Sequence, residues 1–327
     1  MTILVTASSG HLGEALVRTL QVQRREAVGI DIFPGAFTQR VGSITDRGFI
    51  RSCTEGVTAV LHAATLHKPH VATHSRQDFV DVNVTGTLNL LEEATAAGVT
   101  AFVYTSTTSV FGDALVPPPG EPAAWVTEDV TPVPKNIYGV TKAAAEDLCQ
   151  LFARNHSLRT IVLRTSRFFP EEDDNRETRE AYADANVKVS EFLYRRVDIE
   201  DVVSAHLLAA QHAPSGGFAK YIISATTPFS HDDVMELRSN APQVARRYVP
   251  DYEVEFARRG WTMISGIDRV YVNAKARAEL GWQPRHDFRS LVARLQADDD
   301  IRSPLAREVG SKGYHDRIFG DGPYPLQ

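Results

Sequence analysis

An apolar run followed by two closely spaced glycines constrains the fold of this chain more than any other feature. Residues 3–6 read as a buried strand, and Gly10 and Gly13 allow a sharp turn into a helix. The apolar positions of that helix share one face: Leu12, Leu16, Val17 and Leu20. In such a turn the backbone can pass close to a bound anion, and the free N–H groups of the helix point at it. Ala7 stands where a first glycine is usual, which we expect to tighten the turn slightly.

A carboxylate follows this turn at the distance expected for a dinucleotide site. Asp31 lies in a second apolar run, residues 27–32, about twenty residues further on. It can accept hydrogen bonds from a ribose diol and would repel a 2′-phosphate, so NAD is favoured over NADP. Arg40 lies close enough in sequence to leave NADP open. The competing interpretation is a glycine turn without a ligand, with Asp31 as a solvated strand end.

Short apolar runs alternate with helical patterns through the first half, which is typical of parallel strands joined by crossover helices. Further strands are predicted at residues 59–63, 101–105 and 160–164, and helices at residues 78–97 and 137–155. The predicted fold class is α/β, a Rossmann-type doubly wound parallel sheet with a smaller C-terminal substrate-binding lobe. We expect residues 1–165 to form the NAD-binding domain, completed by residues 198–210 and neighbouring elements. Residues 166–327 would then form mainly the substrate-binding lobe and a tail.

After residue 164 the pattern is looser. A helix after a short strand is predicted at residues 197–210, a strand at 221–224, and a loop and then a capped helix within 227–237. Residues 171–179 read as a charge-dense loop. Residues 303–327, rich in Gly, Pro and aromatic side chains, read as an irregular tail.

Composition excludes several classes of partner. The 327 residues carry a net charge of -6, so there is no basic excess to attract nucleic acid. Cys53 and Cys149 are the only cysteines, too few for a disulfide framework and not at metal-site spacing, which favours a reducing compartment. Residue 3 begins an apolar strand without a charged leader before it, and no apolar run approaches membrane-spanning length. We expect a cytoplasmic protein without nucleic-acid, membrane or metal partners.

Tyr138 and Lys142 are suited to proton transfer, because a helix brings side chains four positions apart onto one face. A nearby ammonium favours the phenolate, so we expect Lys142 to lower the pKa of Tyr138 toward neutral. A hydroxyl cluster, residues 105–107, ends the preceding strand. A carbonyl held between a Thr hydroxyl and the phenol would be stabilised as hydride arrives. Thr107 is the predicted hydroxyl and Ser106 the alternative.

With these motifs in place, the chain resembles an extended short-chain dehydrogenase/reductase of the NAD-dependent epimerase/dehydratase type. The resemblance covers nearly the whole chain and is carried by residues 6–13, 62–64, 83–87, 102–112, 138–142 and 273–284. It implies an enzyme with a Rossmann fold and NAD. It also implies a homodimer, built from the helices at residues 78–97 and 137–155.

The resemblance assigns roles residue by residue. Tyr138 would be the acid/base, Thr107 would bond the substrate oxygen, Lys142 would bind the nicotinamide ribose, and Asn83 would support the proton relay. The implied cofactor contacts are Thr6, Gly10, His11, Leu12, Gly13, Asp31, Ile32, Ser43, Ile44, Ala63, Ala64, Thr65, Asn83, Thr105, Tyr138, Lys142, Thr165 and Arg167. At residues 43–44 the family often has an Asp-hydrophobic pair, and the missing Asp leaves the adenine contact open.

The substrate end carries weaker signals. The nucleotide-gripping pattern of nucleotide-sugar enzymes is not evident. Residues 164–176 instead resemble the corresponding stretch of uronate dehydrogenases, in which an arginine at the position of Arg176 meets a sugar carboxylate. The alternative is that Arg176 pairs with Glu172 or Asp173 in a solvated acidic loop. The predicted substrate contacts are His67, Thr107, Thr108, Arg167 and Arg176.

Three further groups have two interpretations each. Residues 67–70 either edge the substrate cleft or form a solvated loop, and they are unsuited to a metal. Arg195 and Arg196 either meet an anionic substrate or cap a strand. The tail aromatics either cover the cleft or pack on the surface: Tyr314, Phe319 and Tyr324.

Three functions therefore compete. The first is an NAD-dependent oxidoreductase acting on a hydroxyl or ketone of a sugar or other small polar substrate without a nucleotide. The second is a nucleotide-sugar 4-epimerase or dehydratase that keeps its NAD bound. The third, a catalytically silent dinucleotide sensor, is disfavoured by the complete set of Thr107, Tyr138 and Lys142.

Overall fold

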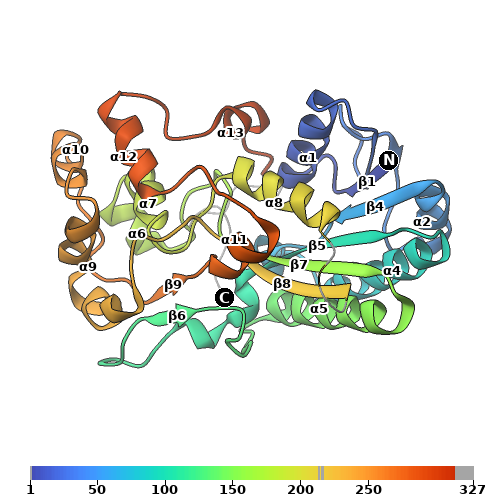
Figure 1. The fold of residues 1–327 in the computed structure, drawn as a ribbon, viewed down its shortest axis with the longest axis horizontal. Helices are drawn as coiled ribbons and strands as arrows, with labels where there is room; N and C mark the ends of the chain where they lie inside the picture. The colour runs from blue at the N-terminus through green and yellow to red at the C-terminus, as the bar shows by residue number, and fades with distance from the viewer. Residues whose placement is uncertain (1, 213, 215–216, 314–327) are drawn as a thin grey trace.

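A seven-stranded parallel sheet forms the centre of the computed structural model, which describes residues 2–212, 214 and 217–313 (Figure 1). Its strand order is β3-β2-β1-β4-β5-β7-β8. The strands are β1 (Thr2–Thr6), β2 (Ala27–Asp31), β3 (Arg40–Val41), β4 (Val57–His62), β5 (Ala101–Thr107), β7 (Arg159–Thr165) and β8 (Phe218–Ile223). The predicted doubly wound α/β fold is confirmed, and the predicted strands lie within one to three residues of these bounds.

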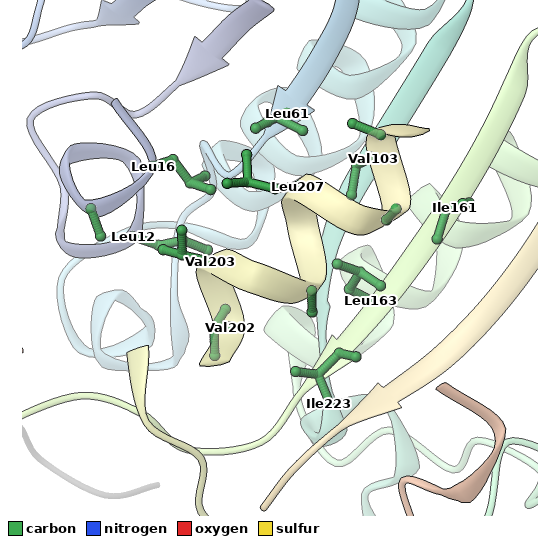
Figure 2. Close-up of a cluster of buried hydrophobic side chains, with 14 of the residues drawn as sticks. Leu12, Leu16, Leu61, Val103, Ile161, Leu163, Val202, Val203, Leu207 and Ile223 are labelled. Carbon is green, nitrogen blue, oxygen red and sulfur yellow. The ribbon is translucent and has the colours of Figure 1, made fainter. Parts of the chain in front are cut away.

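Helices cover both faces of the sheet because its central strands are apolar on both sides. On one face lie α1 (His11–Val22) and α8 (Ile199–Gln211). Figure 2 shows Leu12 and Leu16 of α1 beside Val203 and Leu207 of α8, packed over side chains of the strands. The opposite face is covered by α2 (Arg47–Thr54), α4 (Gly86–Ala96) and α5 (Ile137–His156). In β1, Ile3 and Val5 join the first layer and Leu4 the second.

The helix predicted at residues 78–97 is present but is not a regular α-helix throughout. It begins as α3 (Arg76–Phe79), continues as a π-helical segment, η2 (Val80–Thr85), and then becomes α4. Such π segments occur often at functional sites. Short 3₁₀ helices lie on nearby loops: η1 (Lys68–Ala72), η3 (Thr108–Phe111) and η4 (Asp113–Leu115).

A second core lies beside the sheet, at the left of Figure 1. It contains residues of α7 (Asp184–Glu191), α9 (Val234–Tyr248), α10 (Tyr252–Arg258) and α12 (Phe288–Gln296). Near it lie α6 (Arg176–Ala181), η6 (His231–Asp233) and a two-stranded parallel sheet of β6 (Ala124–Val126) and β9 (Arg269–Tyr271). Two late helices pack back on the first layer: α11 (Ala274–Leu280) contacts β8 and α8, and α13 (Pro304–Val309) contacts α1 and α8. A boundary at residue 165 stays a prediction.

Two predicted irregular segments contain helices. Within residues 171–179, α6 begins because the Asn175 side chain accepts the N–H groups of Glu177 and Thr178. Within residues 303–327, α13 begins because Ser303 accepts an N–H group and Pro304 stands at the first helical position. Both caps are sequence signals that the predictions missed. The tail aromatics Tyr314, Phe319 and Tyr324 lie outside the described residues.

Before α8, the predicted short strand is reduced to an isolated bridge between Arg167 and Arg196. The predicted capped helix is confirmed, since Ser230 and Asp233 form a capping box ahead of α9. Within the described residues, no helix combines the length and the apolar character that crossing a membrane requires.

Candidate active site

A cavity of about 1010 Å³ lies at the carboxyl ends of β1, β2, β4, β5 and β7. Ligands of doubly wound sheets bind at this edge, beside the point where the strand order reverses, here between β1 and β4. Most predicted site residues line it: Gly10, His11, Leu12, Gly13, Asp31, Ile32, Ser43, Ile44, Ala63, Ala64, Thr65, His67, Thr105, Thr107, Thr108, Tyr138, Lys142, Thr165 and Arg167. Of the predicted residues, Thr6, Asn83 and Arg176 are not among the lining side chains.

The glycine turn is built around the carbonyl of Ala7. The Gly10 N–H donates to this oxygen at 2.9 Å, and a Cβ on Gly13 would lie only 1.8 Å from it. Gly13 is therefore required by close approach. Ala7 itself has φ +58, in the left-handed region that favours glycine. The departure at Ala7 thus places an alanine in a conformation that costs energy.

Asp31 lies at the edge of the cavity near the glycine turn. Its carboxylate accepts the Ser9 N–H and the Phe33 N–H, both at 3.0 Å, and keeps further lone pairs toward the cavity. Arg40 is the residue that kept NADP as a candidate cofactor in the sequence. Its side chain donates to the carbonyl of Ser52 at 2.6 Å and does not line the cavity. This arrangement fits a ribose diol better than a 2′-phosphate.

Thr6 supports the cavity floor from below. Its hydroxyl accepts the N–H groups of Ala63 and Ala64, at 2.9 and 2.8 Å, and bonds the Nδ1 of His62 at 2.9 Å. The Nε2 of His62 bonds Thr87, whose hydroxyl donates to the carbonyl of Asn83. His62 therefore donates from Nε2 and accepts at Nδ1, and burial lowers its pKa to about 3. This neutral network ties the ends of β1 and β4 to the start of α4.

Asn83 lies on the π segment η2 and is 1% exposed. Its Oδ1 accepts the Thr65 hydroxyl and the Leu66 N–H, and its Nδ2 donates to the Leu66 carbonyl and the Thr141 hydroxyl. All four hydrogen-bonding positions are thereby filled by protein groups. Asn83 connects the loop after β4 to the helix that carries Tyr138, and a role in proton relay stays a prediction.

Thr107, Tyr138 and Lys142 meet at the cavity, as predicted. Thr107 ends β5, and Tyr138 begins α5, whose N-cap Asn136 accepts the Gly139 N–H at 3.1 Å. Tyr138 is 2% exposed, and its phenol forms a hydrogen bond with the Thr107 side chain. The ring of His67 lies 4.9 Å from the Tyr138 ring, measured between centroids.

The predicted effect of Lys142 on Tyr138 is wrong for the protein alone. Burial raises the pKa of Tyr138 above its ordinary value, and only the hydrogen bond with Thr107 opposes this shift. Lys142 donates to the Thr105 carbonyl at 2.6 Å and lies 4.1 Å from the centroid of the Tyr104 ring. Burial lowers the pKa of Lys142 to about 7, against the attraction of Glu146. Desolvation therefore sets the direction of the pKa shift of both groups, because both are buried.

Ser106, the alternative hydroxyl, is occupied elsewhere. It donates to Glu146 at 2.6 Å, and Glu146 also pairs with Arg164 at 2.7 Å and with Lys220 at 3.3 Å. Although burial opposes it, Arg164 holds the pKa of Glu146 below its ordinary range. This buried cluster was not predicted from the sequence. Its signal was a carboxylate one helical turn after Lys142 on the buried face.

Thr105 lines the cavity, but a second buried histidine bonds its hydroxyl. The Nε2 of His206 lies 2.7 Å from the Thr105 hydroxyl, and its Nδ1 lies 2.8 Å from the Val202 carbonyl. Nδ1 must be the donor because a carbonyl only accepts, so Thr105 donates to Nε2. Burial lowers the pKa of His206 to about 4. This contact joins β5 to α8 and was also missed.

The cationic side chains that were considered as substrate contacts are paired with carboxylates. Arg167 lies 2.6 Å from Asp173 and 3.4 Å from Glu191. Lys68 pairs with Asp174. Arg176 pairs with Glu180 on its own helix at 2.7 Å and is not among the residues that line the cavity, so its contact with a substrate stays a prediction.

Two arginines nevertheless keep an unused donor. Arg195 pairs with Glu191 and Asp173, and Arg269 with Asp268. The Nε atoms of both are buried and have no hydrogen-bond partner among the described residues. Both arginines line the cavity. Arg269 was not predicted, because only the pairing of β9 with β6 brings it there.

A further buried polar atom without a partner among the described residues lies at the start of α1. His11 is the first residue of α1, and its ring stacks on Phe168 with 5.8 Å between centroids. Its Nδ1 is buried and finds no partner among the described residues. An orphaned polar atom beside free helix N–H groups and the Gly13 turn fits the diphosphate of a dinucleotide.

Within the described residues, one group of side chains with metal-ligand chemistry lies outside the cavity lining. Asp198, Glu200 and His286 offer ligand atoms within 4.8 Å of one another. Asp198 accepts the N–H groups of Glu200 and Ser303, and Glu200 bonds His286 at 2.9 Å. These bonds account for the cluster as a junction between α8 and the C-terminal segments.

Comparisons with known proteins match much of the chain. A model of the NAD dependent epimerase/dehydratase family matches residues 3–223. A UDP-glucose 4-epimerase of Erwinia amylovora is 31% identical over 185 residues, which are 50% of this chain and 52% of that protein. In this match and two others the chain spans about half of the relative's length, between 40% and 52%. A 3-beta-hydroxysteroid dehydrogenase of Mycolicibacterium neoaurum is 26% identical over 325 residues, 86% of this chain and 87% of that protein.

A solved structure is similar over nearly the whole chain. It is that of a short-chain dehydrogenase/reductase superfamily protein from Agrobacterium tumefaciens with bound NAD, with a TM-score of 0.64 and 24% sequence identity. The match covers 94% of this chain and 99% of that chain. At this identity the likeness supports the fold.

Proposed function

Because the chain belongs to the NAD-dependent epimerase/dehydratase family, we propose that it is an NAD-dependent oxidoreductase. It would move a hydride between nicotinamide and a hydroxyl or ketone of a small polar substrate. The observation that carries this proposal is that Thr107, Tyr138 and Lys142 line one cavity with the Gly10–Gly13 turn.

In this proposal the bound nicotinamide accepts or supplies the hydride. Tyr138 gives a proton to the substrate oxygen in reduction and takes one in oxidation. The hydroxyl of Thr107 donates to the same oxygen and stabilises its developing charge. Lys142, whose amine is held at the Thr105 carbonyl, would bind the nicotinamide ribose. Burial of Tyr138 excludes water from the proton transfer.

NAD, not NADP, is the proposed cofactor. The carboxylate of Asp31 is held at the cavity edge by two backbone N–H groups. A 2′-phosphate placed there would be repelled, and Arg40 is engaged with Ser52. We expect binding to NAD to be at least about tenfold tighter than to NADP, measured by calorimetry.

The proposed substrate is a sugar or similar polar molecule that carries a carboxylate and no nucleotide. Glu172 and Asp174 line the part of the cavity beside Arg167, where they would repel the diphosphate of a nucleotide-sugar. The buried, unpartnered Nε atoms of Arg195 and Arg269 favour one carboxylate instead.

A nucleotide-sugar 4-epimerase or dehydratase is the second candidate. Relatives named as UDP-glucose 4-epimerases favour it, since one covers 89% of this chain at 26% identity. The same three residues would serve that chemistry, with NAD retained and no net redox change.

One experiment separates the two candidates. The purified protein is incubated with NAD and a panel of free sugar acids and UDP-sugars, and absorbance reports NADH. NADH production with a sugar acid supports the first proposal. Conversion of a UDP-sugar without net NADH supports the second, and no turnover with either class contradicts both. The Tyr138→Phe variant is the control, and we expect its rate to fall at least about a hundredfold.

Its predicted assembly is a homodimer. Apolar side chains are exposed on the helices named above: Val80 on η2, and Val140 and Leu151 on α5. In an isolated chain these would leave an apolar surface in water.

We also propose that the protein works in the cytoplasm. Cys53 and Cys149 are both free and buried, which fits a reducing compartment. Localisation of a tagged chain by fractionation tests this proposal.

A further inference from the structure

The last described segment of the chain, residues 303–313, crosses back to the dinucleotide end of the sheet. The Ser303 N–H donates to Asp198, and α13 packs on α1 and α8, as Figure 1 shows. Val309 is 4% exposed and belongs to the core of that layer. Lys312, three residues after α13, therefore lies beside the first turn of α1.

This segment brings a cation to the glycine turn. The Nζ of Lys312 lies 2.6 Å from Glu14, in the first turn of α1, and its side chain is 31% exposed. Lys312 lines the same cavity as Gly10 and His11. Its charge also reaches the imidazole, since burial and then Lys312 lower the pKa of His11 to about 4.

Groups of both signs surround this position. Glu14 also pairs with Arg18 at 2.8 Å, and the hydroxyl of Ser311 donates to Glu171 at 2.6 Å. Asp198 and Arg196 act on His11 from the α8 side. Lys312 is the cation at this end that both lines the cavity and pairs with α1.

We propose that Lys312 and His11 bind the diphosphate of the dinucleotide, with Lys312 exchanging Glu14 for a phosphate oxygen. His11 stays neutral and donates from its unpartnered Nδ1, while the first N–H groups of α1 complete the anion site. The C-terminal segment thereby becomes part of the cofactor site. This inference rests on the proposed dinucleotide function.

The test compares ligands with and without the diphosphate. Dissociation constants of NAD, ADP-ribose and adenosine are measured by calorimetry for the unchanged protein and for Lys312→Met. We expect NAD and ADP-ribose to bind about tenfold more weakly to the variant, and adenosine to bind equally. The loss should shrink at high salt. Equal affinity for ADP-ribose in both proteins would overturn the proposal.

Glu14→Gln separates phosphate binding from a purely structural latch. If Lys312 meets the phosphate, removing its competing carboxylate leaves ADP-ribose affinity unchanged or higher. If the pair only anchors the segment, Glu14→Gln weakens binding as Lys312→Met does, and the proposal fails. Arg302→Met, which changes the residue just before this segment and breaks only its pair with Asp300, is the matched control. Melting temperatures establish that each variant is folded.

Failure of this inference is distinguishable from failure of the proposed function. If the unchanged protein binds neither NAD nor ADP-ribose, the dinucleotide function itself is wrong. If it binds both and Lys312→Met binds them equally, only the role of Lys312 is wrong.

Discussion

The phenol of Tyr138 is buried against Thr107 and the ring of His67, and desolvation dominates its titration. The raised pKa keeps this group protonated at neutral pH, which suits donation to a substrate oxygen in reduction. Oxidation needs the phenolate, so the buried environment favours one direction of the reaction at neutral pH.

The pH dependence of the two directions follows from this shift. Because the pKa of Tyr138 is raised, the phenolate fraction grows only as pH rises above neutral. We expect the oxidation rate at saturating NAD to increase from about pH 7 to about pH 9, while the reduction rate stays nearly flat. Stopped-flow absorbance of NADH at several pH values measures both. An oxidation rate that levels off below about pH 7 would contradict this assignment.

At the turn, Gly13→Ala tests the close approach to Ala7. A Cβ would lie 1.8 Å from the Ala7 carbonyl, so the turn must open. We expect the free energy of unfolding to fall by about 2 kcal/mol and NAD binding to be lost. Gly48→Ala, whose Cβ would lie 3.4 Å from the nearest atom, is the control and should change neither. An unchanged NAD affinity for Gly13→Ala would contradict this account of the turn.

At the scale of helices and strands, buried polar contacts join the elements that carry the site. Glu146 of α5 binds Ser106 of β5 and Arg164 of β7, and His206 of α8 binds Thr105 of β5. These contacts engage the two residues that precede Thr107 on β5, Ser106 and Thr105. The orientation of the active hydroxyl therefore depends on helices on both faces of the sheet.

Glu146→Gln should reveal this dependence. The substitution leaves Arg164, whose side chain is 3% exposed, without a carboxylate. We expect a loss of about 3 kcal/mol in the free energy of unfolding, measured with urea. Glu92→Gln removes the exposed pair with Arg47 and should cost less than about 1 kcal/mol. Equal losses of unfolding free energy in the two variants would show that the buried cluster stabilises the protein no more than an exposed ion pair does.

The whole molecule adds two features that no single element contains. The second core carries Arg269 to the cavity on β9, and the C-terminal segment carries Lys312 to α1. The proposed dimer would add a third feature. It would cover apolar side chains that are exposed in the single chain, such as Val140 on α5, which is 50% exposed.

Val140→Lys tests the dimer. A charge in an apolar helix interface is costly to desolvate, so the variant should be a monomer at concentrations where the unchanged protein is a dimer. Light scattering after size exclusion measures both masses. Met235→Lys, which changes another exposed apolar residue away from these helices, is the control. A monomeric unchanged protein would contradict the dimer.

The sequence by itself determined the main alternation of strands and helices in the first half of the chain, the glycine turn and the Tyr138–Lys142 pair, because apolar periodicity and short-range spacing set them. Asp31 was predictable for the same reason. The tertiary structure decided that Ser106 is bound by Glu146, and that burial raises the pKa of Tyr138. It also decided that Arg176 lies outside the cavity lining while Arg269 and Lys312 lie within it. Desolvation and contacts between distant segments depend on packing, which local patterns do not contain.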